Sequence, residues 1–346
     1  AYATRVLRRL ANSSDAVVFS YPLMDGDAEQ SPSGLLREVS DSNSDSLEDP
    51  GWYARTVAAA SAVYAVDIDP VPAVKPSEDV AGGTATIQRQ LTNPFSAFAA
   101  GRLGVSPVPR LSYGLPAIVR GRIIHSALAE LYRGVDSLEA LRAIEVDDLE
   151  RRVGTAARQA TGWLDSKADA VVRQLLQFER RRIADLLHAV VDLDLLRPPF
   201  SIVGLEVPVG LAADNIDMSL RADRIDRDST GLIILDYKTG RPRKFLGSDG
   251  DPEDMQLVAY ACAIDEPTSG LALVNVDSRH VDISGAGVDL TPEINWEDAL
   301  GRWRAEVRRA LNELQEGVVR VNGTLSAKDL RPFGLLSRVQ ELTRAS

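Results

Sequence analysis

Cysteine is almost absent from this sequence of 346 residues, in which Cys262 is the only one. A single thiol excludes a disulfide within the chain, and it excludes a zinc or iron–sulfur site built from several cysteines of this chain. No run of roughly 18 apolar residues occurs, so a membrane-spanning helix is not expected. We therefore expect a cytoplasmic protein without membrane association and without an iron–sulfur cluster.

The N-terminus lacks the apolar segment of a signal peptide, and the first residue is Ala1 rather than Met. We expect a processed chain or a segment of a larger protein. The net charge of −11 argues against a protein that coats nucleic acid. Residues 1–80 contain most of the excess negative charge, whereas the rest is nearly balanced and contains basic clusters. Such clusters are commonly solvated faces, but one of them directly follows Asp236 and Lys238.

The pattern of apolar residues predicts an α/β protein. Residues 1–80 are expected to form a helix, a short strand, a polar loop and a second helix, before a Pro-rich linker at 65–79 that places a domain boundary near residue 80. The second domain, 81–346, begins with a helix at 117–133 and a helical insertion at about 137–192. Strands are predicted at 201–210, 215–226, 231–238 and 270–277, with helices at 252–264 and 296–315.

Two carboxylates stand at the ends of neighbouring predicted strands. Asp223 closes the second strand and Asp236 the third, and a short turn between these strands brings the two carboxylates together. Lys238 follows two residues after Asp236, so both point to the same face. Two carboxylates favour Mg²⁺ or Mn²⁺, and an amine beside them can orient water or neutralise charge on a phosphate. The alternative is a simple ion pair at the end of a strand.

The segment "LRADRIDRDSTGLIILDYKTG" resembles the signature of the RecB-type branch of PD-(D/E)XK nucleases. Three further segments resemble motifs of that branch in the same order along the chain: "RGRIIHSALAELY" with His125, "LEVPVG" with Glu206, and "QLVAY" with Gln256 and Tyr260. The resemblance implies an α-β-β-β-α-β core of the restriction-endonuclease type with helical flanks. It also implies a metal-dependent deoxyribonuclease that acts in DNA repair or recombination.

The resemblance further implies roles for individual residues. The metal ligands would be His125, Asp223, Asp236 and the carbonyl of Tyr237, with Lys238 as the catalytic amine. Catalysis would also involve Glu206, Gln256 and Tyr260. The DNA-binding residues are expected in the basic cluster of Arg241, Arg243 and Lys244. Ordinary packing remains the alternative for His125, Gln256 and Tyr260, and Glu206 could be a plain strand-end acid.

The flanks are similar to those of AddB-type bacterial repair proteins, which join an inactive helicase portion to the nuclease. "LTNPFSAFAAGRL" resembles their Cys-Pro-Phe segment, with Asn93 in place of the cysteine. The partners implied are DNA and a helicase subunit, or a helicase-like remainder of the same chain. We also expect Phe95 or Phe98 to touch residues 332–336. Two other classes stay open: a catalytically silent DNA-end-binding or scaffolding module, and a relative that acts on RNA.

Overall fold

The computed structural model describes residues 2–13, short stretches between 17 and 36, and 71–320 except for 76–77, 79, 107–114, 166–169, 278–279, 289 and 292–293. The chain forms two compact units, Ala1–Ile68 and Asp69–Ser346. The first unit contains α1 (Tyr2–Ala11), the short antiparallel strands β1 (Met24–Asp25) and β2 (Ala28–Glu29), and the 3₁₀ turn η1 (Gly34–Leu36). Of the strand predicted at 15–22, residues 17 and 19–21 are described and none of them is in a strand, whereas the second predicted helix lies outside the described residues.

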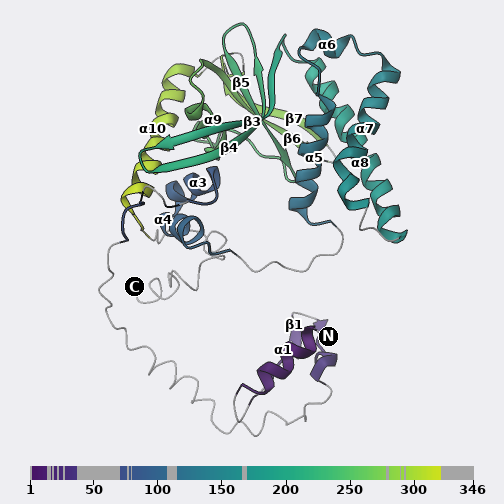
Figure 1. The fold of residues 1–346 in the computed structure, drawn as a ribbon, viewed down its shortest axis with the longest axis vertical. Helices are drawn as coiled ribbons and strands as arrows, with labels where there is room; N and C mark the ends of the chain where they lie inside the picture. Colours follow the sequence, from purple (N-terminus) through teal and green to yellow (C-terminus); the bar gives the residue numbers. More distant parts are fainter. Residues whose placement is uncertain are drawn as a thin grey trace. The chain divides into compact units, whose positions relative to one another are not determined.

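The second unit is built on one mixed sheet with the strand order β3, β4, β5, β6, β7 (Figure 1). The strands are β3 (Ser201–Ala213), β4 (Ile216–Arg227), β5 (Leu232–Thr239), β6 (Thr268–Asp277) and β7 (His280–Gly287). β5 and β6 are parallel, and each other neighbouring pair is antiparallel. Helix α9 (Gln256–Ala263) lies in the crossover connection that a parallel pair requires.

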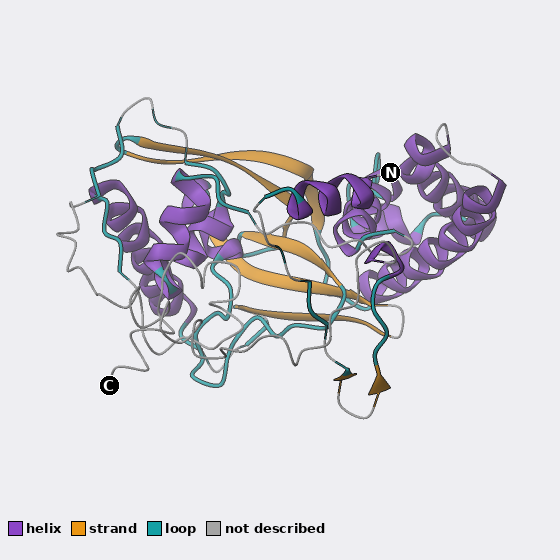
Figure 2. Ribbon diagram, turned by 90° about the horizontal axis from the view of Figure 1, so that it is seen from below, coloured by secondary structure: helices purple, strands orange, loops and turns teal. Residues whose placement is uncertain are grey.

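Helices cover both faces of this sheet, and each face has its own apolar core (Figure 2). One face carries α3 (Thr84–Thr92), α9 and α10 (Trp296–Glu316). The other carries α5 (Ala117–Leu131), α6 (Leu138–Arg142), α7 (Val146–Asp165) and α8 (Ala170–Leu195). Within β5, Ile234 packs into the first core and Leu235 into the second. The continuous apolar run before Asp236 is therefore buried on both faces, as the sequence predicts.

The turn between β4 and β5 follows from its residue types. The Oδ1 of Asp228 accepts hydrogen bonds from the backbone N–H groups of Thr230 and Gly231, at 2.7 and 2.8 Å. These bonds close the turn and set the register in which Arg227 faces Leu232. That register decides which residues of β4 and β5 lie side by side at the end of the hairpin away from the turn.

Several boundaries differ from the sequence-based expectation. Helix α9 begins at Gln256 rather than near 252, because Pro252 pairs with Leu246 in an isolated β-bridge and is not available to the helix. The helical insertion comprises α6, α7 and α8 and continues to Leu195. The edge strand β7 was not predicted. Among the helices that the structure describes, none has the length and apolar character needed to cross a bilayer.

The segment before α5 contains α3, α4 (Pro94–Ala97) and the π-helical turn η3 (Phe98–Arg102). The backbone N–H of Phe95 donates to the carbonyl of Arg320 at 3.0 Å, so this segment contacts the chain just after α10. The expected contact between Phe95 or Phe98 and residues 332–336 lies outside the described residues. Val74 and Val80 belong to the core of the second unit, and Val74 N–H donates to Gln315.

Candidate active site

Three carboxylates occupy equivalent positions across three adjacent strands. The β4–β5 ladder ends at the pair Arg224 and Leu235, and Asp223 and Asp236 are the next residues outward. On the other side, β3 and β4 pair at Leu205 with Arg224 and at Val207 with Ala222, which places Glu206 opposite Asp223. The register of the sheet therefore assembles the acids at one place.

Glu206 has a positive φ of 49°, in the left-handed region that side-chain-bearing residues rarely adopt. Such backbone strain is found mostly where the surrounding structure holds a functional group in place. The side chain of Glu206 reaches the same space as Asp223 and His125. A sequence pattern of strand residues carries no signal for this conformation.

His125 comes from α5 and completes a group of three potential metal ligands with Glu206 and Asp223. Its Nδ1 lies 3.0 Å from Asp223 Oδ1, and ligand atoms of the three residues lie within 4.8 Å of one another. Burial lowers the pKa of His125, but the hydrogen bond to Asp223 and the negative charges of Asp223, Asp236 and Glu206 outweigh it and raise the pKa overall. The crowded negative charge is the environment that a divalent cation stabilises.

Asp236 is 2% exposed and is not part of that group of three. Its Oδ1 accepts a hydrogen bond from Gln256 Nε2 at 2.8 Å, and its Oδ2 lies 2.7 Å from Lys238 Nζ. Burial and the negative charge of Asp223 raise the pKa of Asp236 to about 6, although Lys238 opposes this. Asp223 Oδ2 in turn accepts the backbone N–H of Tyr237 at 2.8 Å, which ties β4 to β5 beyond the last ladder pair.

Gln256 connects the remaining polar residues of the site. Its Oε1 accepts from Lys238 Nζ at 2.6 Å, and its Nε2 donates to Asp236 and to the Tyr260 hydroxyl, the latter at 2.7 Å. Gln256 and Tyr260 lie one helical turn apart on α9, on the same face. The structure thus brings Lys238, Asp236, Gln256 and Tyr260 together.

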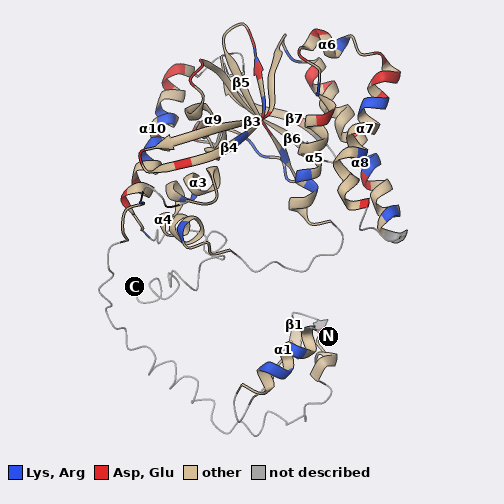
Figure 3. Ribbon diagram, in the orientation of Figure 1, with Lys and Arg blue, Asp and Glu red and all other residues tan. Residues whose placement is uncertain are grey.

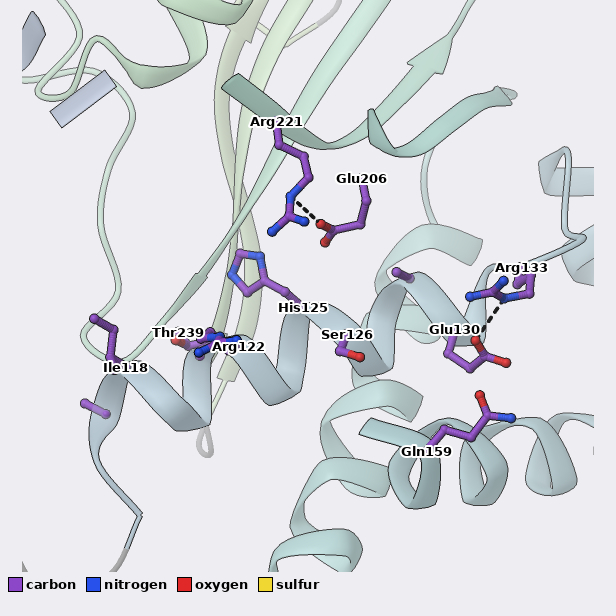
Figure 4. Close-up of a pocket in the computed structure, with 13 residues that line it drawn as sticks. Ile118, Arg122, His125, Ser126, Glu130, Arg133, Gln159, Glu206, Arg221 and Thr239 are labelled. Atoms are coloured by element: carbon purple, nitrogen blue, oxygen red, sulfur yellow. Dashed lines mark hydrogen bonds and ion pairs between the residues drawn. The ribbon is translucent and has the colours of Figure 1, made fainter. Parts of the chain in front are cut away.

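A groove of about 910 Å³ opens beside the ligand group (Figure 4). His125 and Glu206 line it together with Arg122, Arg221 and Thr239. Figure 4 shows His125 on α5 pointing toward Glu206 and Arg221, with Glu130 further along the same helix and Arg133 just beyond its end.

A family model, the PD-(D/E)XK nuclease superfamily, matches residues 85–325, which is more than half of the chain. This chain belongs to the PD-(D/E)XK nuclease superfamily. The match confirms the predicted fold, an α/β core in which α5, β3, β4, β5, α9 and β6 follow one another. No curated protein matches the chain. The RecB-type and AddB-type resemblance stays a prediction.

The superfamily name contains the pattern Asp-x-Lys, which Asp236, Tyr237 and Lys238 supply. Superfamily members are nucleases that use divalent metal ions, and the oxygen-rich donor set of Glu206 and Asp223, with one imidazole, suits such an ion. The ligand set inferred from the motifs included Asp236 and the Tyr237 carbonyl, whereas the group of three includes Glu206 instead. The roles of the individual residues remain predictions.

Behind the candidate site lies a buried charge network that the sequence pattern does not predict. Arg224, next to Asp223 on β4, has a fully buried side chain. Its guanidinium donates to Asp226 Oδ1 at 2.7 Å and to Asp194 Oδ2 at 2.6 Å, and it lies 4.4 Å from the centre of the Tyr132 ring. The Tyr132 hydroxyl donates to Asp194 at 2.5 Å. These contacts join β4, the strand that carries Asp223, to α8 and to Tyr132 at the C-terminal end of α5.

The predicted DNA-binding residues Arg241, Arg243 and Lys244 are exposed on the loop after β5. They do not line the groove. The side chain of Asn275 on β6 fixes this loop, since it accepts from the N–H of Arg243 and donates to its carbonyl, both at 2.9 Å. Positive and negative residues are interspersed on α7, α8 and α10 (Figure 3). The basic residues of the loop after β5 therefore form a local cluster.

Proposed function

We propose that this protein is a metal-dependent deoxyribonuclease that hydrolyses phosphodiester bonds in DNA repair or recombination. The observation that carries the proposal is the convergence of Glu206, Asp223 and Asp236 from three strands with Lys238 beside them. Three carboxylates crowded in a partly buried site are costly unless a cation neutralises them. The ammonium of Lys238 is better explained by a role in phosphate chemistry than by a simple ion pair at the end of a strand, because Gln256 holds it in position.

His125, Glu206 and Asp223 would hold the cation, with Asp236 close by. A bound Mg²⁺ or Mn²⁺ would supply Lewis-acid activation of a water and of the phosphate. Lys238 would stabilise negative charge that develops on the phosphate oxygens, since its Nζ is fixed before the reaction begins. Gln256 holds Lys238 and Asp236 in their relative positions, and Tyr260 holds Gln256.

The groove supports an extended polymer as the substrate rather than a small phosphate ester. It is open to solvent and bordered by arginines, including Arg122 and Arg221. Because the chain as a whole is acidic, we expect DNA to approach over the local basic surfaces, including the loop with Arg243 and Lys244. The similarity of the flanks to AddB-type proteins supports a helicase, or a helicase-like part of a longer chain, as the partner.

The proposal is tested with end-labelled single-stranded DNA, double-stranded DNA and RNA of one sequence, each incubated with Mn²⁺, Mg²⁺ or EDTA. We expect cleavage of DNA that requires a divalent ion and stops in EDTA. Cleavage of RNA alone would assign the site to RNA metabolism. Tight DNA binding without cleavage in either metal would instead show a silent DNA-end-binding or scaffolding module and would contradict the proposal.

A further inference from the structure

Arg221 contacts the candidate ligand group, although the family resemblance gives no role to this position of the signature segment. It lies on β4 two residues before Asp223, so both side chains leave the same face of the strand. Its neighbours Leu220 and Ala222 point the other way, into the core. Arg221 Nε lies 2.8 Å from Glu206 Oε2, and the Arg221 side chain is 69% exposed in the groove (Figure 4).

The contact between Arg221 and Glu206 competes with a cation for the same carboxylate. Glu206 is one of the three residues whose ligand atoms cluster within 4.8 Å. A guanidinium at 2.8 Å supplies part of the positive charge that Glu206 and Asp223 need. A divalent cation bound to the group would be coordinated by Glu206 and would repel the guanidinium of Arg221. Exposed ion pairs contribute little to stability, so the exchange requires no rearrangement of the fold.

We propose that Arg221 is a substrate-positioning residue that neutralises Glu206 in the metal-free protein and binds a phosphate of the nucleic acid once a cation replaces it. This inference rests on the proposed function. A displaced guanidinium remains in the groove, next to the reaction centre. Its planar donors match two phosphate oxygens at once, which an ammonium cannot do. Arg221 would thereby fix the strand relative to Lys238 and Asp236.

The experiment compares the wild type with Arg221→Gln and Arg221→Lys in two binding measurements that need no turnover. Mn²⁺ affinity is measured by calorimetry without DNA. Affinity for a fluorescein-labelled DNA oligonucleotide is measured over a series of salt concentrations, with Ca²⁺ in place of Mg²⁺ to suppress cleavage. Arg227→Gln is the matched control, because Arg227 lies on the same strand and pairs with Glu266 at 2.6 Å, with both side chains about half exposed.

For Arg221→Gln we expect Mn²⁺ affinity to rise by up to roughly fivefold, because a competing cation is removed. DNA affinity should fall about tenfold, as expected for a lost charged hydrogen bond. The plot of log K against log salt should become shallower by about one. Arg221→Lys should keep the salt slope but lose part of the affinity, and Arg227→Gln should behave as the wild type.

The proposal requires both changes in Arg221→Gln, and the absence of either one overturns it. Weaker Mn²⁺ binding would show that Arg221 supports Glu206 rather than competes for it. If the wild type binds both Mn²⁺ and DNA and Arg221→Gln binds each of them equally well, Arg221 does not have this role, and the nuclease proposal stays intact. A wild type that binds no DNA would contradict the proposed function, and this inference with it.

Discussion

The Nζ of Lys238 lies 2.7 Å from Oδ2 of Asp236, two residues earlier on the same strand. Gln256 closes the arrangement, because it accepts from Lys238 and donates to Asp236. A lysine on a flexible stem is thereby fixed beside a carboxylate that is itself buried. This fixed geometry favours catalysis, since a charge that is already in place costs no reorganisation when the reaction occurs.

Replacing Lys238 with Ala should lower turnover by roughly 10²–10³-fold, the loss typical of one electrostatic stabiliser in an active site. Mn²⁺ affinity should not fall, because the substitution removes a positive charge next to the carboxylates. Single-turnover cleavage and calorimetric metal binding measure the two effects separately. Lys75→Ala, which removes an exposed lysine outside the candidate site and the basic loop, is the control. Wild-type rates in Lys238→Ala would remove this residue from catalysis.

The stability of the metal-free protein should depend on pH through Asp236. Its pKa is raised from an ordinary 3.8 to about 6, first by burial and then by Asp223. Between these values the folded state binds a proton that the unfolded state does not, so this group lowers stability as pH rises through about 6. Asp236→Asn, which mimics the protonated form, should raise the melting temperature at about pH 7.5 but not at about pH 4.

Mn²⁺ should stabilise the wild type more strongly at the higher pH, because protons and metal compete for the carboxylates. The control for Asp236→Asn in these melting experiments is Asp217→Asn, since Asp217 is an exposed acid on β4. Equal destabilisation by Asp236→Asn at both pH values would identify Asp236 as a purely structural partner of Lys238.

Replacing Arg224 with Met should cost about 3–5 kcal/mol of the free energy of unfolding, because Asp194 and Asp226 would lose a buried partner. Urea denaturation followed by circular dichroism measures this loss. Arg227→Met on the same strand should cost less than about 1 kcal/mol, since its partner Glu266 is exposed. Equal losses in the two variants would show that the buried network contributes no more than a surface ion pair.

Reversing the charge of Arg243 and Lys244 together, as Arg243→Glu with Lys244→Glu, should weaken DNA binding and reduce its salt dependence. The loop itself should keep its place, because Asn275 holds it through the backbone of Arg243. Fluorescence anisotropy with labelled DNA at several salt concentrations measures both effects. Unchanged binding would direct attention to another basic surface, such as Arg180 to Arg182 on α8.

The hairpin that carries Asp223 and Asp236 was predictable because its signals are local. Residues alternate along β4, and Asp228 and Gly231 specify the turn, so the register follows from neighbouring residues. Edge strand β7 gives no such signal, because it ends in small residues. Gly285 and Gly287 allow close approach to β6, where an added Cβ would lie 2.5 Å from a backbone oxygen of Leu271 or Ser269.

Two features of the site depend on residues far apart in the sequence, and the local residue pattern does not predict them. Only the family resemblance placed His125, Glu206 and Asp223 in one site. An arginine on an alternating strand is expected to face solvent, yet Arg224 is buried because Asp194, on α8, comes to meet it. The group formed by His125, Glu206 and Asp223 likewise depends on the positive φ at Glu206. The position of Arg221 could have been predicted from the sequence, since residues alternate along a strand and Arg221 therefore lies on the same face as Asp223.

The most direct test of the account is the initial rate of Mn²⁺-dependent DNA cleavage by the wild type, Asp223→Asn and Asp217→Asn. Both acids lie on β4 and point to the same face, but Asp217 is exposed and remote from the ligand group. We predict that Asp223→Asn abolishes cleavage while it keeps the circular dichroism spectrum of the wild type, and that Asp217→Asn cleaves normally. Cleavage by Asp223→Asn at the wild-type rate would contradict the account.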